Sequence, residues 1–209
     1  MLARDIPPQT LRRSSEDRQK EIVEAVLALA AEVGVEAVTT GLIAERVGLS
    51  QGAVFRHFPN KEAIWAAVLS WFKNHLDEVF QVKSDAPWVE LERIFNDYTR
   101  LYTRYPAMPR LVFSDTCHHA YPALRQGIRE LIRVCEGRLR SLIEAAARRG
   151  ETRPDLDVAA AARLFLASIQ GMAFQSAILG FTDDPERLPL PLFRLWRQAL
   201  IHEESHDPA

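Results

Sequence analysis

Residues 38–61 read VTTGLIAERVGLSQGAVFRHFPNK, and no other part of the chain places so many position-specific signals so close together. Thr39 is a good N-cap for a short helix, and Gly48 suits the left-handed turn that would end it. Ser50 is a good N-cap for a following helix, which Pro59 would break. The stretch therefore predicts two short helices joined by a tight turn that contains glycine, the helix-turn-helix arrangement.

The second of these helices has two unlike faces. Val54 and Phe58 are four residues apart, so we expect them to lie together on the buried face. At about 100° per residue, the opposite face carries Gly52, Ala53 and Arg56. Two of these outward residues have almost no side chain, which suits a helix that presses into the major groove of DNA. Gln51 and Arg56 then remain to form hydrogen bonds with base edges.

The run TT..IA..VG.S.GAVFRHF..K resembles the N-terminal signature of the TetR family of bacterial transcriptional regulators, over roughly residues 16–65. A weaker resemblance continues in residues 148–172, RRGETRPDLDVAAAARLFLASIQGM. The resemblance implies an all-α fold in which a three-helix DNA-binding domain precedes a larger helical domain that binds an effector and dimerises. We expect a flexible arm at residues 1–14, the DNA-binding domain at 15–62 and the effector domain at 63–209.

The same resemblance implies two groups of DNA contacts. The residues expected at phosphates are Thr39, Thr40, Phe55, His57 and Lys61. Those expected at base edges are Gln51, Gly52, Ala53 and Arg56, with Ser50 at the start of the same helix. The sequence departs from the family pattern at two positions: Phe55 replaces the usual Tyr, and Gly41 replaces a usual polar or basic residue. We therefore expect fewer contacts for each half-site of DNA.

Overall charge gives no independent sign of a DNA partner. The chain has 26 Lys and Arg against 28 Asp and Glu, a net charge of −2. Between Thr39 and Lys61, three basic residues face one Glu, so 3 − 1 = +2, and any basic surface must be local. A three-helix packing unit with no role in DNA binding remains the alternative, although it leaves the small outward face unexplained.

The chain shows no sign of secretion or catalysis. The first twenty residues contain no apolar run that would serve as a signal peptide, and we expect no segment near the roughly 18 uncharged residues of a membrane span. A glycine-rich phosphate loop, GxSxG and HExxH are all missing. We therefore expect a cytoplasmic protein that is not an enzyme, binds no cofactor and does not associate with a membrane.

The two cysteines, Cys117 and Cys135, have no CxxC spacing, and we expect both to be buried thiols. Cys117 begins the sequence Cys-His-His, which has ligand types that suit zinc or copper. Adjacent residues on a helix point about 100° apart and rarely converge on one ion. We therefore predict no metal site.

Aromatic residues between Trp88 and Tyr105 recur at near-helical spacing, which usually indicates a core. Buried tyrosine hydroxyls need partners, however, so an effector pocket is a second interpretation. The pocket would be lined by Tyr98, Tyr102, Phe113, Phe165 and Ile169.

Two further helices are expected to form a dimer. In residues 127–149, apolar residues alternate spacings of four and three, which predicts a packing seam. The seam consists of Ile128, Ile132, Cys135, Leu139, Leu142 and Ala146. Residues 155–180 are rich in Ala, Ser and Gly, which let helices approach closely. In the TetR family such helices form a four-helix bundle between subunits; the alternative is a hairpin within one subunit.

These observations predict a homodimeric transcriptional regulator, a repressor that leaves a palindromic double-stranded DNA operator when a small, partly apolar effector binds. Two other hypotheses remain open. The protein could be a DNA-bound scaffold that recruits a protein partner, or an all-α ligand-binding protein without a role in DNA binding.

Overall fold

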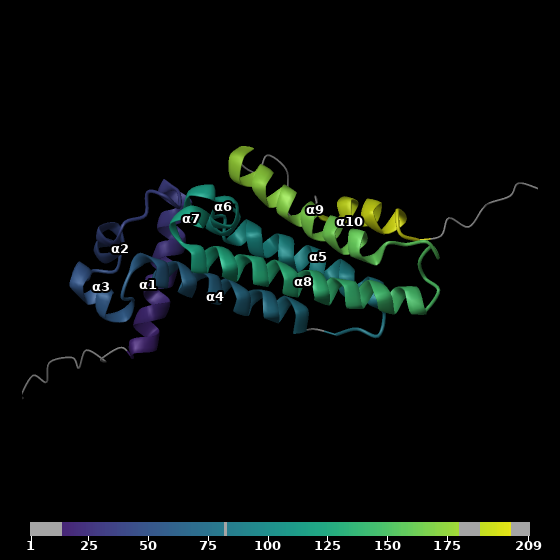
Figure 1. Ribbon diagram of the computed structural model, residues 1–209, viewed down its shortest axis with the longest axis horizontal. Helices are drawn as coiled ribbons and strands as arrows, with labels where there is room; N and C mark the ends of the chain where they lie inside the picture. Colours follow the sequence, from purple (N-terminus) through teal and green to yellow (C-terminus); the bar gives the residue numbers. More distant parts are fainter. Residues whose placement is uncertain (1–13, 82, 180–188, 202–209) are drawn as a thin grey trace, which may run out of the picture.

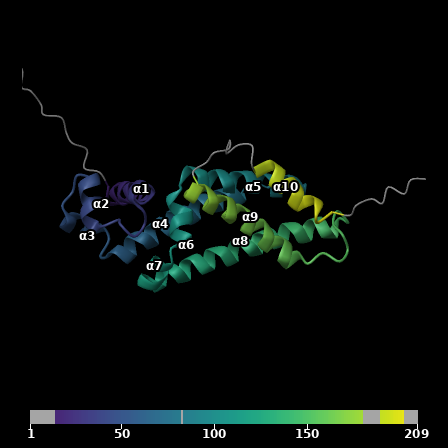
Figure 2. The ribbon, with the colours of Figure 1, turned by 90° about the horizontal axis from the view of Figure 1, so that it is seen from above.

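The computed structural model describes residues 14–81, 83–179 and 189–201, and these residues form helices and no strand, which confirms the all-α fold. The helices are α1 (Ser15–Val33), α2 (Thr40–Arg46), α3 (Gln51–His57), α4 (Lys61–Gln81), α5 (Pro87–Arg104), α6 (Ala107–Phe113), α7 (Asp115–Ala120), α8 (Pro122–Arg148), α9 (Val158–Leu179) and α10 (Pro189–Gln198). In Figures 1 and 2 the molecule is elongated, with α1–α3 at one end and α8 along much of the remaining length. The arm predicted at residues 1–14 lies outside the described residues, apart from Ser14, which caps α1.

Short-range hydrogen bonds determine where α2 and α3 begin. The hydroxyl oxygens of Thr39 and Ser50 accept hydrogen bonds from the backbone N–H groups three residues later, each at 3.2 Å. Gly48 lies between the two helices with a φ angle of 65°, a conformation that favours glycine. The helix-turn-helix predicted from residues 38–61 is therefore present.

Helix α4 connects these helices to the rest of the molecule. It packs against α1, α5 and α8, in agreement with the apolar residues on two of its sides. Its buried residues are Ile64, Trp65, Val68, Leu69, Phe72, Leu76 and Phe80. Because α4 begins at Lys61, the boundary predicted between residues 62 and 63 falls within its first turn.

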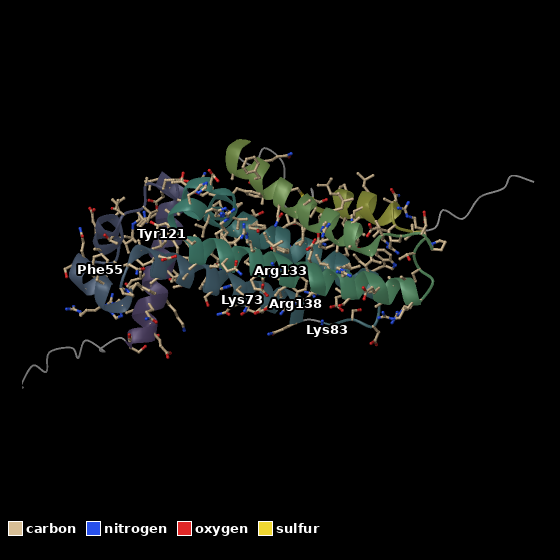
Figure 3. All side chains as sticks on the ribbon, viewed as in Figure 1. Phe55, Lys73, Lys83, Tyr121, Arg133 and Arg138 are labelled. Atoms are coloured by element: carbon tan, nitrogen blue, oxygen red, sulfur yellow. The ribbon has the colours of Figure 1, made fainter. Side chains whose placement is uncertain are left out.

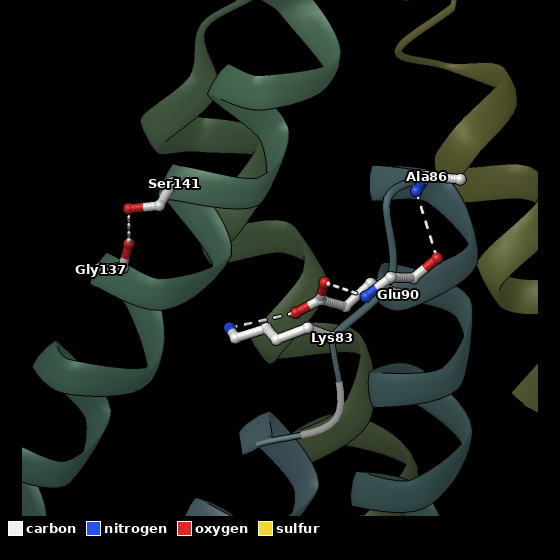
Figure 4. Close-up of polar contacts among 6 residues, drawn as sticks. Lys83, Ala86, Glu90, Gly137 and Ser141 are labelled. Atoms are coloured by element: carbon white, nitrogen blue, oxygen red, sulfur yellow. Dashed lines mark hydrogen bonds and ion pairs between the residues drawn. The ribbon is translucent and has the colours of Figure 1, made fainter.

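A buried carboxylate organises the segment that leads into α5. Glu90 is only 2% exposed, and its oxygens accept hydrogen bonds from the Ser84 backbone N–H at 3.1 Å and the Lys83 ammonium at 3.3 Å (Figure 4). The Ser84 hydroxyl in turn accepts a hydrogen bond from the Ala86 N–H at 3.2 Å. Since an unpaired buried carboxylate is costly, these bonds hold the segment against α5.

Helices α8 and α9 pack against each other within the subunit. Four residues of the predicted seam face this interior: Ile128, Cys135, Leu139 and Ala146 are 3%, 1%, 0% and 0% exposed. They contribute to the subunit's own core, so their assignment to the dimer contact was wrong, whereas Ile132 of the same seam is 36% exposed. The two helices themselves remain candidates for that contact through their outer faces.

The composition of α9 corrects a second expectation. Residues 164–182 carry no charged side chain, so the expectation that no such stretch exists was wrong. Among the described residues, α9 is the one helix long and apolar enough to cross a membrane; its window Val158–Ala177 has a mean hydropathy of 1.2. In this fold one side of α9 packs against α5, α6, α8 and α10.

The other side of α9 is not covered by the subunit. It carries a row of exposed or half-exposed residues: Ala160, Leu164, Ala167, Gly171 and Phe174. We call this row the outer stripe of α9. Its two large members, Leu164 and Phe174, are 52% and 44% exposed.

Candidate nucleic-acid interface

The exposed face of α3 carries Gln51, Gly52, Phe55 and Arg56. Phe55 is 42% exposed and lies at the end of the molecule formed by α1–α3 (Figure 3). On the opposite side of the helix Val54 is fully buried. The face therefore combines two side chains that can donate hydrogen bonds with one exposed aromatic ring, beside a glycine that allows close approach.

Ala53 does not belong to this face, and its prediction as an outward residue was wrong. It is 6% exposed and packs into the core. The outward position of Ala53 was expected on the basis that Phe58 is helical, but α3 ends at His57 and Phe58 has φ −138° and ψ 111°. Because the extended backbone changes the direction of the Phe58 side chain, the buried face of α3 is centred nearer Ala53 and Val54.

The departure at Gly41 has a steric consequence. A Cβ atom at Gly41 would lie 3.1 Å from Nε2 of Gln51 and 3.6 Å from Oγ1 of Thr39. The Gln51 amide thus lies against the start of α2, in the space that a larger residue would occupy. A side chain at this position would therefore press on the Gln51 amide, which would have to move by a few tenths of an ångström.

The basic residues of this region are not equally available. Arg46 forms a two-pronged ion pair with Glu32 of α1, with N–O distances of 2.6 and 3.0 Å, and this pairing lowers the pKa of Glu32. Arg56 is exposed and makes no ion pair with any described residue. The local positive charge that faces outward therefore comes from Arg56 and Lys61. Arg46 instead joins α2 to α1 through its ion pair with Glu32.

The predicted phosphate contacts lie around the exposed face of α3. Thr39 is exposed, whereas Thr40, His57 and Lys61 are half-exposed. His57 Nδ1 lies 3.4 Å from the Ser15 hydroxyl, so this side chain connects the end of α3 to the start of α1. These side chains come from three helix ends, the start of α2, the end of α3 and the start of α4. Contacts from several helix ends suit a set that positions a helix on DNA.

Arg110 of α6 connects the N-terminal helices to the bundle. Its guanidinium donates to the carbonyl oxygen of Ala31 at 2.9 Å and to that of Ala30 at 3.5 Å, both in the last turn of α1. It also donates to the carbonyl oxygen of Ala177 in α9 at 3.5 Å. Nearby, the Ser114 hydroxyl donates to Glu36 at 2.6 Å and lowers the pKa of that carboxyl. Arg110 therefore joins α6 to both α1 and α9.

Most of the five residues predicted to line an effector pocket are buried and packed against other side chains. Tyr98 and Tyr102 stack with ring centroids 5.2 Å apart, and Phe165 packs edge-on against Phe95 at 5.1 Å. Ile169 is 1% exposed. Phe113 lies apart from them, 46% exposed and in contact with Phe174 at 5.3 Å. Four of the five are thus core residues, because neighbouring rings fill the space between the helices.

Buried hydroxyl and thiol groups meet at this core. Burial raises the pKa of the Cys135 thiol to about 11 and raises the pKa of Tyr98 and Tyr102. Both cysteines are free and buried, as predicted. In the part of the chain that the structure describes, no group of three or more His, Cys, Asp and Glu side chains could hold a metal ion.

Comparison with known proteins decides the family. Residues 22–68 match "Bacterial regulatory proteins, tetR family", and residues 117–189 match "Tetracyclin repressor-like, C-terminal domain". The chain belongs to the TetR family. The resemblance that the helix-turn-helix residues carried in the sequence is confirmed, and it extends to the C-terminal domain.

The chain is similar to several known proteins over most of their length. The nucleoid occlusion factor SlmA of Marinomonas sp. (strain MWYL1) is 26% identical over 159 residues, covering 74% of this chain and 80% of the relative. The FadR regulator of Bacillus subtilis, solved with stearoyl-CoA, superposes with a TM-score of 0.72 at 19% identity, covering 88% of this chain and 99% of FadR. The ketosteroid regulator KstR2 of Mycobacterium tuberculosis superposes with a TM-score of 0.71 at 18% identity, covering 89% of this chain and 96% of KstR2. This TetR-family chain therefore has the fold of the FadR and KstR2 structures.

Sequence reasoning missed two features that the structure reveals. Arg110 gave no signal, because its partners are backbone carbonyl groups up to 80 residues away in the chain. The outer stripe of α9 did carry a signal in the helical spacing of Leu164, Ala167, Gly171 and Phe174. That signal was hidden because α9 is apolar on its other sides as well.

Proposed function

We propose that this TetR-family protein is a cytoplasmic, homodimeric repressor that leaves a palindromic DNA operator when a small molecule binds its C-terminal domain. The observation that carries the proposal is the exposed face of α3, where Gln51 and Arg56 flank Phe55 and Gly52. Its outward side chains match the needs of a helix in the major groove, and its position at one end of the molecule leaves it accessible.

Dimerisation would use the outer stripe of α9. An exposed row of apolar and small residues next to α8 allows the same row of a second copy to pack closely, and a two-fold interface pairs identical patches. The dimer would present two α3 helices about 34 to 36 Å apart, or a multiple of this distance, so the operator would be palindromic.

Effector binding would act through the contacts between the bundle and α1. Arg110 and the Ser114–Glu36 hydrogen bond join the two parts, and α4 continues from one into the other. An effector would favour a distance between the two α3 helices of the dimer at which they cannot both contact their half-sites. DNA binding would then weaken by roughly 5- to 150-fold, the usual range of such coupling.

A second function has specific support. The predicted pocket residues are packed, and the relative of Marinomonas is named a nucleoid occlusion factor. A DNA-bound protein that recruits a protein partner would need no internal chamber. Purified protein that binds DNA but responds to no small molecule, and that retains a second protein only when DNA is present, would favour this function.

Titration of labelled genomic fragments with the purified protein tests the DNA-binding role. If the dimer contacts about eight phosphates, the plot of log K against log salt should have a slope near −7. Fragments selected at high salt should share a palindrome. A flat salt dependence and no shared sequence among selected fragments would contradict the proposal.

A further inference from the structure

A hollow of about 310 Å³ lies between α4 and α8, and no function described above uses it. Its apolar wall includes Leu69 of α4 with Leu124, Leu131 and Val134 of α8. The helices meet closely at Gly127, where a Cβ atom would lie 2.7 Å from the Leu69 side chain. The hollow lies beside this contact, where small residues such as Ala66 leave space.

One cation at the rim of the hollow is unpaired. Lys73 is exposed and forms no ion pair or hydrogen bond with any described residue. The acidic groups near it are already engaged: Glu130 is 2.7 Å from Arg133, and Asp77 is 2.7 Å from Arg138. Figure 3 shows the three basic side chains along α4 and α8. The rim therefore offers one free positive charge next to an apolar wall.

We propose that this hollow binds a small amphiphile with an unbranched apolar chain and one carboxylate head. The chain would lie against the leucines, and the carboxylate would accept hydrogen bonds from the Lys73 ammonium and the neighbouring Ser70 hydroxyl. A single free ammonium matches one negative charge better than a doubly charged head. The volume is at the lower end of the range for ligand pockets, so the chain is of medium length.

Binding at this place bears on regulation, and this consequence rests on the proposed function. Lys73 lies twelve residues after Lys61 on α4, about 18 Å along the helix axis. A ligand held by both α4 and α8 changes how closely these helices approach at Gly127. Because α4 continues to the DNA-binding helices, that change alters the spacing of the two α3 helices in a dimer.

Calorimetric titration of the full-length, DNA-free protein with decanoate tests the site. Decanoate should bind saturably, whereas 1-decanol and decylamine, which lack the carboxylate, should bind at least about tenfold more weakly. Lys73→Met should weaken decanoate binding by about tenfold, the loss expected for one hydrogen bond between charged groups, and Lys73→Arg should restore most of it. Ala66→Leu, at an exposed position that narrows the hollow, should also weaken binding.

Lys20→Met is the matched control, because Lys20 is an exposed helical lysine on α1, and it should bind decanoate like the wild type. The proposal is overturned if decanoate does not saturate, if 1-decanol binds equally well, or if Lys73→Met binds like the wild type. DNA titration of the same samples without decanoate separates the two ideas. A protein that binds DNA but not decanoate refutes the ligand site alone. A protein that binds decanoate but not DNA refutes the repressor function.

Discussion

The DNA-binding helices and the aromatic core of the bundle differ in how their side chains find their directions. In α2 and α3, hydroxyl caps three residues from their partners set where each helix begins. In the bundle, Tyr98, Phe165 and their neighbours are oriented by rings from other helices. Local chemistry thus predicts the first region well, whereas the second depends on what packs against it.

The packed state of the aromatic core can be tested by removing one ring. Phe165 is fully buried between Phe95 and Trp196, so Phe165→Ala should lower the free energy of unfolding by about 3 to 5 kcal/mol. Urea denaturation at fixed protein concentration measures the change. Leu195→Ala, at a position that is 63% exposed, is the control and should stay within about 0.5 kcal/mol. A loss below about 1 kcal/mol for Phe165→Ala would show that the ring lines a space rather than fills it.

Charged substitutions in the outer stripe of α9 test whether this stripe forms the dimer contact. The double variant Leu164→Glu and Phe174→Glu should weaken dimerisation at least about 100-fold, about 3 kcal/mol, because four carboxylates would be brought together in the interface. Sedimentation equilibrium over a range of concentrations measures this. Leu195→Glu on α10 should leave the dimer intact. A dimer that survives the double variant would place the subunit contact elsewhere.

Substitutions on α3 test whether its exposed face reads sequence. Gln51→Ala and Arg56→Ala should each cost about 1 to 3 kcal/mol of DNA affinity and relax specificity at one base pair. Binding to a library of operator variants measures both effects. Arg46→Ala is the arginine control, because that side chain is paired with Glu32, and it should not change base preference. An even loss across all sequences for Arg56→Ala would assign that residue to phosphate.

The buried thiol of the bundle predicts a pH effect. Cys135 has a pKa raised from 9.0 to about 11, so between these values the unfolded chain loses its proton while the folded chain keeps it. The free energy of unfolding should therefore fall as the pH rises from about 9 to about 11, by on the order of 1–2 kcal/mol. The stability of Cys135→Ala should fall less steeply over this pH range than that of the wild type. Urea denaturation at several pH values measures the slopes; equal slopes for Cys135→Ala and the wild type would contradict the assignment.

Ala53 and the seam of α8 were misplaced for a common physical reason. Ala53 was misplaced because Phe58 leaves the helix, and helical geometry holds only within a helix. The seam of α8 was assigned to the second subunit because its spacing indicates that another helix packs against it. The spacing does not indicate whether that helix belongs to the same subunit. Spacing indicates that a face is buried, and the identity of the covering element comes from contacts distant in the chain.

The sequence by itself determined the helix-turn-helix, the caps of α2 and α3, the left-handed turn at Gly48 and the family to which these belong. Each of these depends on atoms within a few residues of one another. Only the tertiary structure decided that Ala53 is buried, that Tyr98, Tyr102 and Phe165 are packed against other rings, and that Arg110 joins α1 to α9. Those features depend on atoms up to 80 residues apart, whose approach is set by the packing of whole helices.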